Sequence, residues 1–236
     1  MGGRDRTPRF QLRAVARSGG GLRWIAELDP ATARRYREAV APALDRIERA
    51  LGPTVLANRA RPDGRLHPSG PAWGRWRRAL QRAAAERATV IVSDVRDCYG
   101  SITAPAVLEA LAILDVPSST AAEIAAVLTE LRNEGLRGLP VGPDPSAILA
   151  NAVLAGADRA VRDAGARVLR WVDDVAIAGP DRRTTVRAFD AWAASLRAAG
   201  LTPHDGKTRL LGPEDGSFGA QAPQSCGGAR GMMLAP

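Results

Sequence analysis

The sequence contains few of the residues that build disulfide frameworks or zinc sites. It has only two cysteines, Cys98 and Cys226, and two histidines, His67 and His204, and none of them has metal-ligand spacing. No run approaches the roughly 18 uncharged apolar residues that a membrane span needs. The basic N-terminal stretch also lacks the apolar core of a secretory signal. We therefore expect a soluble, cytoplasmic protein without a disulfide framework, a zinc site or a membrane segment.

Lysine is almost absent, although the chain is strongly basic. The 33 Lys and Arg residues give a formal net charge of +8, yet Lys207 is the single lysine. A basic surface attracts polyanions, and nucleic acid is the first candidate partner; a genome bias toward arginine codons is the alternative explanation. Lysine can give up its proton near neutral pH and arginine cannot. Lys207 is therefore a candidate functional residue.

The chain divides by composition into four parts. Residues 1–28 are expected to form a basic, flexible lead, and residues 29–88 a helical region that begins at an Asp-Pro helix start. Residues 89–211 carry the clearest strand and helix patterns, and residues 212–236 are a tail rich in glycine and proline. A chain of 236 residues can bury one sizeable core.

The order of elements predicts an α+β fold. "TVIVSD", a β-branched strand, ends at Asp94, and helices follow it. "RVLRWVDDVAIAG" then predicts a hairpin, followed by a helix and the short strand "KTRLLG". This is a β-α-β-β-α-β unit, an antiparallel sheet with helices on one face. In this topology Asp94 lies beside Asp173 and Asp174, because the first strand and the hairpin are neighbours.

Asp173 and Asp174 are expected at the tip of the hairpin. One interpretation is an ordinary Asp-Asp turn in solvent. The other follows from electrostatics, since converging carboxylates repel one another and need a cation. Three carboxylates suit Mg²⁺, with Mn²⁺ as the alternative. Two such ions about 4 Å apart would activate an attacking hydroxyl and stabilise the leaving oxygen in phosphoryl transfer.

Four stretches together resemble consecutive palm motifs of the reverse transcriptases. They are "VSDVRDCYGSI", "GLPVGPDPSAILAN", "RWVDDVAIAG" and "AGLTPHDGKTRLL". The resemblance implies a polymerase palm over residues 89–211, a fingers-like part over 29–88 and no evident thumb after Leu211. It also implies an RNA-directed DNA polymerase that uses an RNA or DNA template and primer with deoxynucleoside triphosphates. The "GLPVGPDPS" form resembles the reverse transcriptases of bacterial phage defence and abortive infection more than those of mobile introns.

The resemblance also assigns roles to individual residues. It makes Asp94, Asp173 and Asp174 the catalytic metal ligands, and Lys207 the residue that protonates or neutralises the departing pyrophosphate. It places a further set around the incoming nucleotide: Arg96, Tyr99, Gly138, Pro140, Gly142 and Ser146. Each of these six also has a structural interpretation. Arg96 would form a surface ion pair, Tyr99 would be a core residue, the glycines and the proline would belong to a plain loop, and Ser146 would cap a helix.

The sequence departs from the family pattern at two positions. Val141 stands where the family usually has glutamine, and Trp171 replaces a tyrosine or phenylalanine. Val141 and the absent thumb favour an alternative, a catalytically inactive palm-derived module that binds nucleic acid or a partner. A nucleotidyl cyclase or a metal-dependent glycosyltransferase fits less well, because their characteristic hairpin motif and nucleotide-binding sheet are not found. Templated or template-free synthesis, a partner protein and a noncoding RNA remain open.

Overall fold

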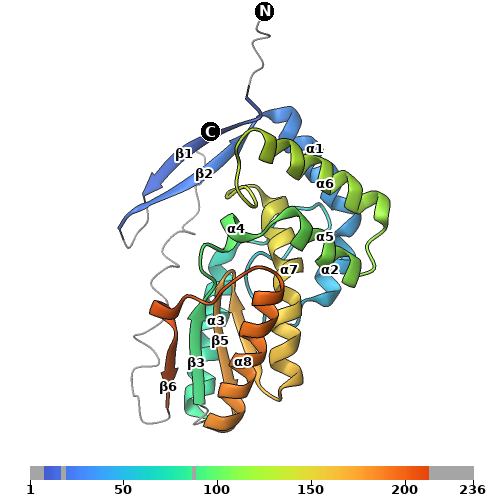
Figure 1. Ribbon diagram of the computed structural model, residues 1–236. Helices are drawn as coiled ribbons and strands as arrows, with labels where there is room; N and C mark the ends of the chain where they lie inside the picture. Colours follow the sequence, from blue (N-terminus) through green and yellow to red (C-terminus); the bar gives the residue numbers. More distant parts are fainter. Residues whose placement is uncertain (1–7, 17–19, 87–88, 213–236) are drawn as a thin grey trace, which may run out of the picture.

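The fold is built on a four-stranded antiparallel sheet. The computed structural model describes residues 8–16, 20–86 and 89–212. The strand order β4-β5-β3-β6 is that of the predicted β-α-β-β-α-β unit, so the predicted α+β palm architecture is confirmed (Figure 1). The strands are β3 (Thr89–Asp94), β4 (Arg167–Trp171), β5 (Asp174–Gly179) and β6 (Arg209–Leu211).

Helices connect the strands where the sequence predicts them. Between β3 and β4 lie α4 (Cys98–Ser101), α5 (Ala104–Ile113), α6 (Ser118–Asn133) and α7 (Asp144–Asp163). Between β5 and β6 lie α8 (Arg182–Ala198) and η2 (Asp205–Lys207). Side chains of Thr103 and Asp181 cap α5 and α8 by accepting hydrogen bonds from backbone amides of the first turn. No helix in the described ranges has the length and apolarity to cross a membrane.

Both faces of the sheet are covered. Alternate strand residues point to opposite faces. Val168 and Ile177 share one core with α7 and α8, whereas Leu169 belongs to the core under α3 (Ser69–Ala85). Trp76 of α3 is fully buried there. The sequence predicted helices on only one face of the sheet. In the structure α3 covers the other face, because its tryptophans pack against the sheet rather than facing solvent.

The N-terminal region contains the helices expected after residue 28. They are α1 (Pro30–Val40), the short η1 (Ala41–Ala43) and α2 (Leu44–Ala50). The Asp29 side chain accepts hydrogen bonds from the amides of Ala31 and Thr32, which fixes the start of α1. A long loop then leads to α3.

The prediction of a flexible lead over residues 1–28 is wrong for the two strands β1 (Phe10–Ala16) and β2 (Leu22–Leu28), which pair as an antiparallel hairpin (Figure 1). Its base is fixed by ion pairs from Arg9 to two glutamates of the α6 region. In "LRWIAEL" apolar residues occupy every second position, 22, 24, 26 and 28, which is typical of a strand. The high arginine content of the surrounding segment had favoured a flexible lead instead. Residues 1–7, 17–19 and 213–236, the last including nearly all of the predicted tail, lie outside the described residues.

Candidate active site

Asp94 ends the central strand β3. All six residues of this strand are buried, and Asp94 itself is 4% exposed. Its carbonyl oxygen accepts a hydrogen bond of 2.7 Å from the amide of His204. The antiparallel register sets Asp94 directly opposite Asp174, the first residue of β5. The pairing of two buried strands thus brings two carboxylates together.

Asp173 lies in the turn between β4 and β5. The two connecting residues are Val172 and Asp173, one position earlier than the Asp173-Asp174 tip that the sequence predicts, because Asp174 already pairs with Trp171. Val172 has φ of 56°, a left-handed conformation that is strained for a β-branched residue. The carbonyl oxygen of Asp173 accepts a hydrogen bond of 3.2 Å from the amide of Val95.

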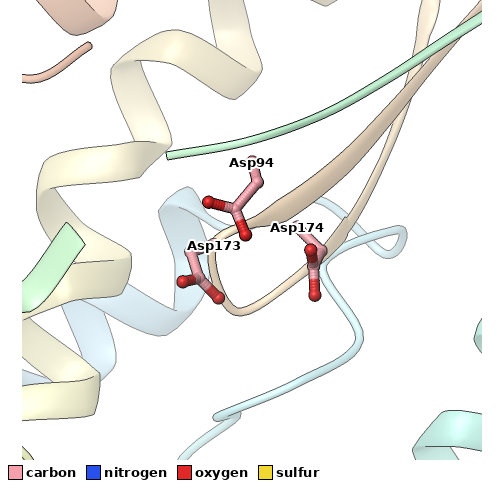
Figure 2. A group of neighbouring side chains, drawn as sticks. All are labelled: Asp94, Asp173 and Asp174. Atoms are coloured by element: carbon pink, nitrogen blue, oxygen red, sulfur yellow. The ribbon is translucent and has the colours of Figure 1, made fainter. Parts of the chain in front are cut away.

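The three carboxylates form one cluster (Figure 2). Ligand oxygens of Asp94, Asp173 and Asp174 all lie within 4.8 Å of one another, and two of the three residues are buried. Burial, and then the neighbouring charge of Asp94, raise the pKa of Asp173 above the usual aspartate range. Such a set of hard oxygen donors fits a divalent cation such as Mg²⁺, which would relieve this repulsion.

Lys207 reaches the cluster from η2, the short helix that precedes β6. Its Nζ lies 2.8 Å from Oδ2 of Asp94, and its side chain is 43% exposed while that of Asp94 is 6% exposed. The ammonium therefore faces both the carboxylates and solvent. The segment before β6 is anchored close by, where the Ser93 and Thr208 hydroxyls lie 2.8 Å apart.

Tyr99 and Gly138 are in direct contact. The carbonyl oxygen of Tyr99 accepts a hydrogen bond of 2.8 Å from the amide of Leu139. Gly138 has φ of 63°, and a Cβ there would lie 2.2 Å from that same carbonyl oxygen, so only glycine fits. The Tyr99 hydroxyl accepts a hydrogen bond of 3.3 Å from Asn58, and burial raises the pKa of the phenol.

The loop that contains Pro140 and Gly142 packs against the N-terminal hairpin. The amide of Ala26 on β2 donates a hydrogen bond of 2.8 Å to the carbonyl oxygen of Val141. A Cβ on Gly142 would lie 2.7 Å from Cγ2 of Ile25, and Pro140 is buried. The hairpin and the loop are therefore one packed unit.

Two residues of the predicted nucleotide set have other partners. The Ser146 side chain is fully buried and lies 3.2 Å from the Tyr36 hydroxyl, and α7 has no side-chain cap. The Arg96 guanidinium is largely exposed and lies 3.1 Å from Asp205. Their contacts match buried packing and a surface ion pair, and a nucleotide role for either residue stays a prediction.

Arg23 is a candidate that sequence reasoning missed. It lies on β2, and its positive charge partly offsets the rise that burial, above all, causes in the pKa of both Asp173 and Tyr99. The hairpin thus contributes a positive charge that acts on these two side chains. The sequence did contain an indication of this strand, an arginine among alternating apolar residues just after a run of glycines. The interpretation of residues 1–28 as a flexible lead left it unused.

Comparisons with known proteins agree with this geometry. A family model described as reverse transcriptase (RNA-dependent DNA polymerase) matches residues 18–218. No curated protein sequence matches significantly. The fold is similar to apo telomerase from Candida tropicalis truncated from its C-terminal domain, with a TM-score of 0.57 and 15% identity over 88% of this chain and 51% of that one.

A second similar structure is telomerase from Candida albicans in complex with a TWJ fragment of telomeric RNA. Its TM-score is 0.52 and its identity 15%, over 85% of this chain and 41% of that chain. The chain thus spans about half or less of the length of these structures, and at such identities the likeness concerns the fold.

Proposed function

The chain belongs to the reverse transcriptase (RNA-dependent DNA polymerase) family, and we propose that it is an active polymerase that adds deoxynucleotides to a nucleic-acid primer by metal-dependent phosphoryl transfer. The observation that carries the proposal is the convergence of Asp94, Asp173 and Asp174 within 4.8 Å, with Lys207 alongside. A module kept only for binding would gain nothing from this repulsive cluster, which costs stability in the absence of a cation.

The three aspartates would hold two Mg²⁺ ions, with Mn²⁺ as a substitute. When bound, these ions would lower the pKa of the primer hydroxyl and stabilise charge on the leaving oxygen. The protein keeps the ligands in place from two rigid strands and a turn. The Lys207 ammonium is partly exposed and lies beside Asp94, and it would give a proton or positive charge to the departing pyrophosphate.

The residues around the cluster would shape the nucleotide site. The Tyr99 ring would lie under the sugar and favour deoxynucleotides over ribonucleotides. The loop from Gly138 to Gly142 would present backbone to the nucleotide, and the Arg23 charge would meet the triphosphate. With Val141 in place of a glutamine, the loop lacks one polar side chain, and we expect reduced fidelity.

The template and the biological role belong to the proposal as well. The net charge of +8 suits a nucleic-acid partner. RNA is the template that the family suggests, and the loop sequence favours a role in bacterial antiviral defence, in the cytoplasm. A partner protein or a noncoding RNA would complete such a system.

The test is incorporation of labelled deoxynucleotides by the purified full chain. Primed RNA, primed DNA and no template would be compared with Mg²⁺ or Mn²⁺, beside an Asp173→Ala, Asp174→Ala double variant. Product on primed RNA that the double variant does not make would support RNA-directed synthesis, and template-free product would point to untemplated extension. Nucleic-acid binding without product under any condition would contradict the proposal and favour an inactive binding module.

A further inference from the structure

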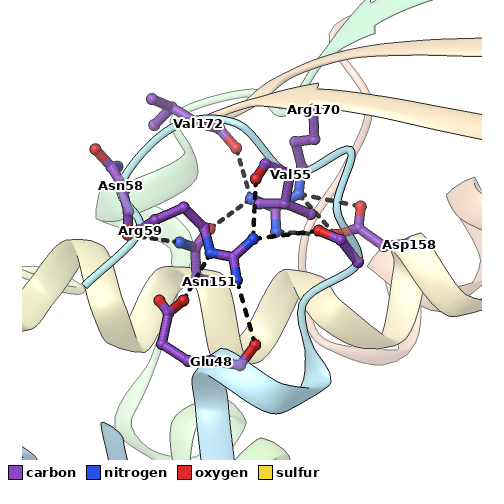
Figure 3. A network of polar contacts seen from close by, with 9 residues as sticks. Glu48, Val55, Asn58, Arg59, Asn151, Asp158, Arg170 and Val172 are labelled. Carbon is purple, nitrogen blue, oxygen red and sulfur yellow. Dashed lines mark hydrogen bonds and ion pairs between the residues drawn. The ribbon is translucent and has the colours of Figure 1, made fainter. Parts of the chain in front are cut away.

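A buried arginine, Arg170, contacts the Val172-Asp173 turn between β4 and β5 (Figure 3). Arg170 of β4 and Asp158 of α7 form an ion pair in which Nη2 lies 2.9 Å from Oδ2, with side chains only 1% and 2% exposed. The guanidinium Nε also donates to this carboxylate at 2.9 Å and 3.0 Å. This pair is the most deeply buried of the ion pairs among the described residues.

The remaining contacts of Arg170 lead to the turn. Its Nη1 donates a hydrogen bond of 2.9 Å to the carbonyl oxygen of Val172 and one of 2.7 Å to Oδ1 of Asn151. Val172 is the residue with φ of 56° immediately before Asp173. The guanidinium therefore binds the strained peptide unit that presents Asp173 to the other two carboxylates.

The network continues from Asn151 to Tyr99. Nδ2 of Asn151 donates a hydrogen bond of 2.9 Å to the carbonyl oxygen of Asn58, and Nδ2 of Asn58 donates to the Tyr99 hydroxyl. The loop around Asn58 is fixed in turn by Arg59, whose Nε lies 2.7 Å from Oε2 of Glu48 (Figure 3). One continuous hydrogen-bond network thus connects the Val172-Asp173 turn to the hydroxyl group of Tyr99.

A buried ion pair is a poor way to gain stability, because the cost of removing both charges from water offsets most of their attraction. Its geometric value is greater, since a planar guanidinium can hold several acceptors in fixed directions. We propose that Arg170 is a positioning residue that holds the Val172-Asp173 turn in its strained conformation, so that Asp173 faces Asp94 and Asp174. The inference rests on the proposed polymerase function for its catalytic consequence, but the position of the turn can be tested alone.

The direct test is hydrogen exchange of the Val95 amide, which donates to the carbonyl oxygen of Asp173. In Arg170→Lys the charge beside Asp158 is kept, but a single ammonium cannot also span the Val172 carbonyl. We expect exchange at Val95 to accelerate about tenfold while amides in the middle of β5 stay unchanged. The matched control is Arg167→Lys on the same strand, whose partner Glu86 and whose own side chain are both exposed.

Two results would overturn the inference. Unchanged exchange at Val95 would show that the turn does not need Arg170, and faster exchange throughout the sheet would show that Arg170 merely supports the fold. If Arg170→Lys does not fold, Asn151→Ser keeps the ion pair and removes the amide that orients Nη1. About threefold faster exchange at Val95 alone is then expected, and no change would overturn the inference.

Kinetics separate this inference from the proposed function. For Arg170→Lys we expect kcat to fall by about tenfold to a hundredfold, with KM for the deoxynucleotide within about twofold of wild type. A wild-type chain without polymerase activity would contradict the proposed function, while the Val95 exchange would still decide whether Arg170 positions the turn.

Discussion

At the residue scale, the proposed chemistry depends on carboxylates held close together against their mutual repulsion. The convergence of the three aspartates could be predicted from the sequence, because the order of strands and helices makes the strand that ends at Asp94 a neighbour of the hairpin that carries the other two. The turn position could not be identified so well. A two-residue loop of Val172 and Asp173 requires a left-handed valine, which propensities disfavour. Arg170 stabilises the turn by donating a hydrogen bond to the Val172 carbonyl oxygen. Its guanidinium is fixed in turn by Asp158 and Asn151 of α7, and the sequence does not show these contacts between two separate elements.

We expect Asp173→Asn to raise the free energy of unfolding by about 1 kcal/mol at pH 7 without divalent cations. A carboxyl whose pKa is higher in the folded chain than in the unfolded one stabilises the fold only at low pH. Above the folded pKa it costs stability, because the raised pKa of Asp173 reflects unfavourable burial and the charge of Asp94.

Urea denaturation with and without Mg²⁺ measures this effect. Mg²⁺ should stabilise the wild type more than the variant, and the advantage of Asp173→Asn should shrink as the pH falls. Asp190→Asn, an exposed position on α8, is the control. A less stable Asp173→Asn in cation-free buffer would show that the aspartate is not under electrostatic strain.

At the element scale, the N-terminal hairpin packs against the loop from Gly138 to Gly142. The palm strands and the helices of residues 89–211 could be predicted, because they have clear periodicity and caps. β1 and β2 could not be predicted, because an arginine-rich segment at this place is typical of a solvated lead. Their attachment to the fold also depends on residues that are distant in the sequence, such as Val141 and Glu130. The hairpin packs Ile25 against Gly142, and the positive charge of Arg23 partly offsets the raised pKa of Asp173.

We therefore expect Arg23→Gln to raise KM for the deoxynucleotide by about tenfold, because a charge-assisted contact with the triphosphate would be lost. The same change removes a positive charge that lowers the pKa of Asp173. The acidic limb of the pH-rate profile should thus move to higher pH. Steady-state kinetics from pH 5 to 8 would measure both effects.

Arg13→Gln is the matched control for this prediction, because Arg13 is on the partner strand and forms its ion pair with Glu27 of β2. Its kinetics should resemble wild type. Equal effects of the two substitutions would assign the loss to the general charge of the hairpin rather than to Arg23.

At the scale of the whole molecule, the excess of arginine predicts binding that depends on salt. The charge of +8 is a property of composition, so the sequence alone supports this expectation. The sequence did not show how the arginines divide between structure and surface. Arg170 is buried and Arg59 is paired with Glu48, so neither is available to nucleic acid.

We expect the Kd for primed RNA, measured by fluorescence anisotropy, to rise at least tenfold between about 50 and 200 mM salt, because bound phosphates release counterions. The slope should be the same for Asp173→Asn as for wild type, since that substitution lies at the metal site. Binding that is insensitive to salt would contradict an electrostatic interface.

If Asp94, Asp173 and Asp174 form a metal site for nucleotide addition, the rate of addition must depend on Mg²⁺. This can be measured as the single-turnover rate of deoxynucleotide addition to primed RNA while Mg²⁺ is titrated, for wild type, Asp94→Asn and Asp190→Asn. We expect saturable dependence on Mg²⁺ in wild type and Asp190→Asn, and a rate at least about a hundredfold lower in Asp94→Asn. Equal rates in all three proteins, or a rate independent of Mg²⁺, would show that the three aspartates are not such a site.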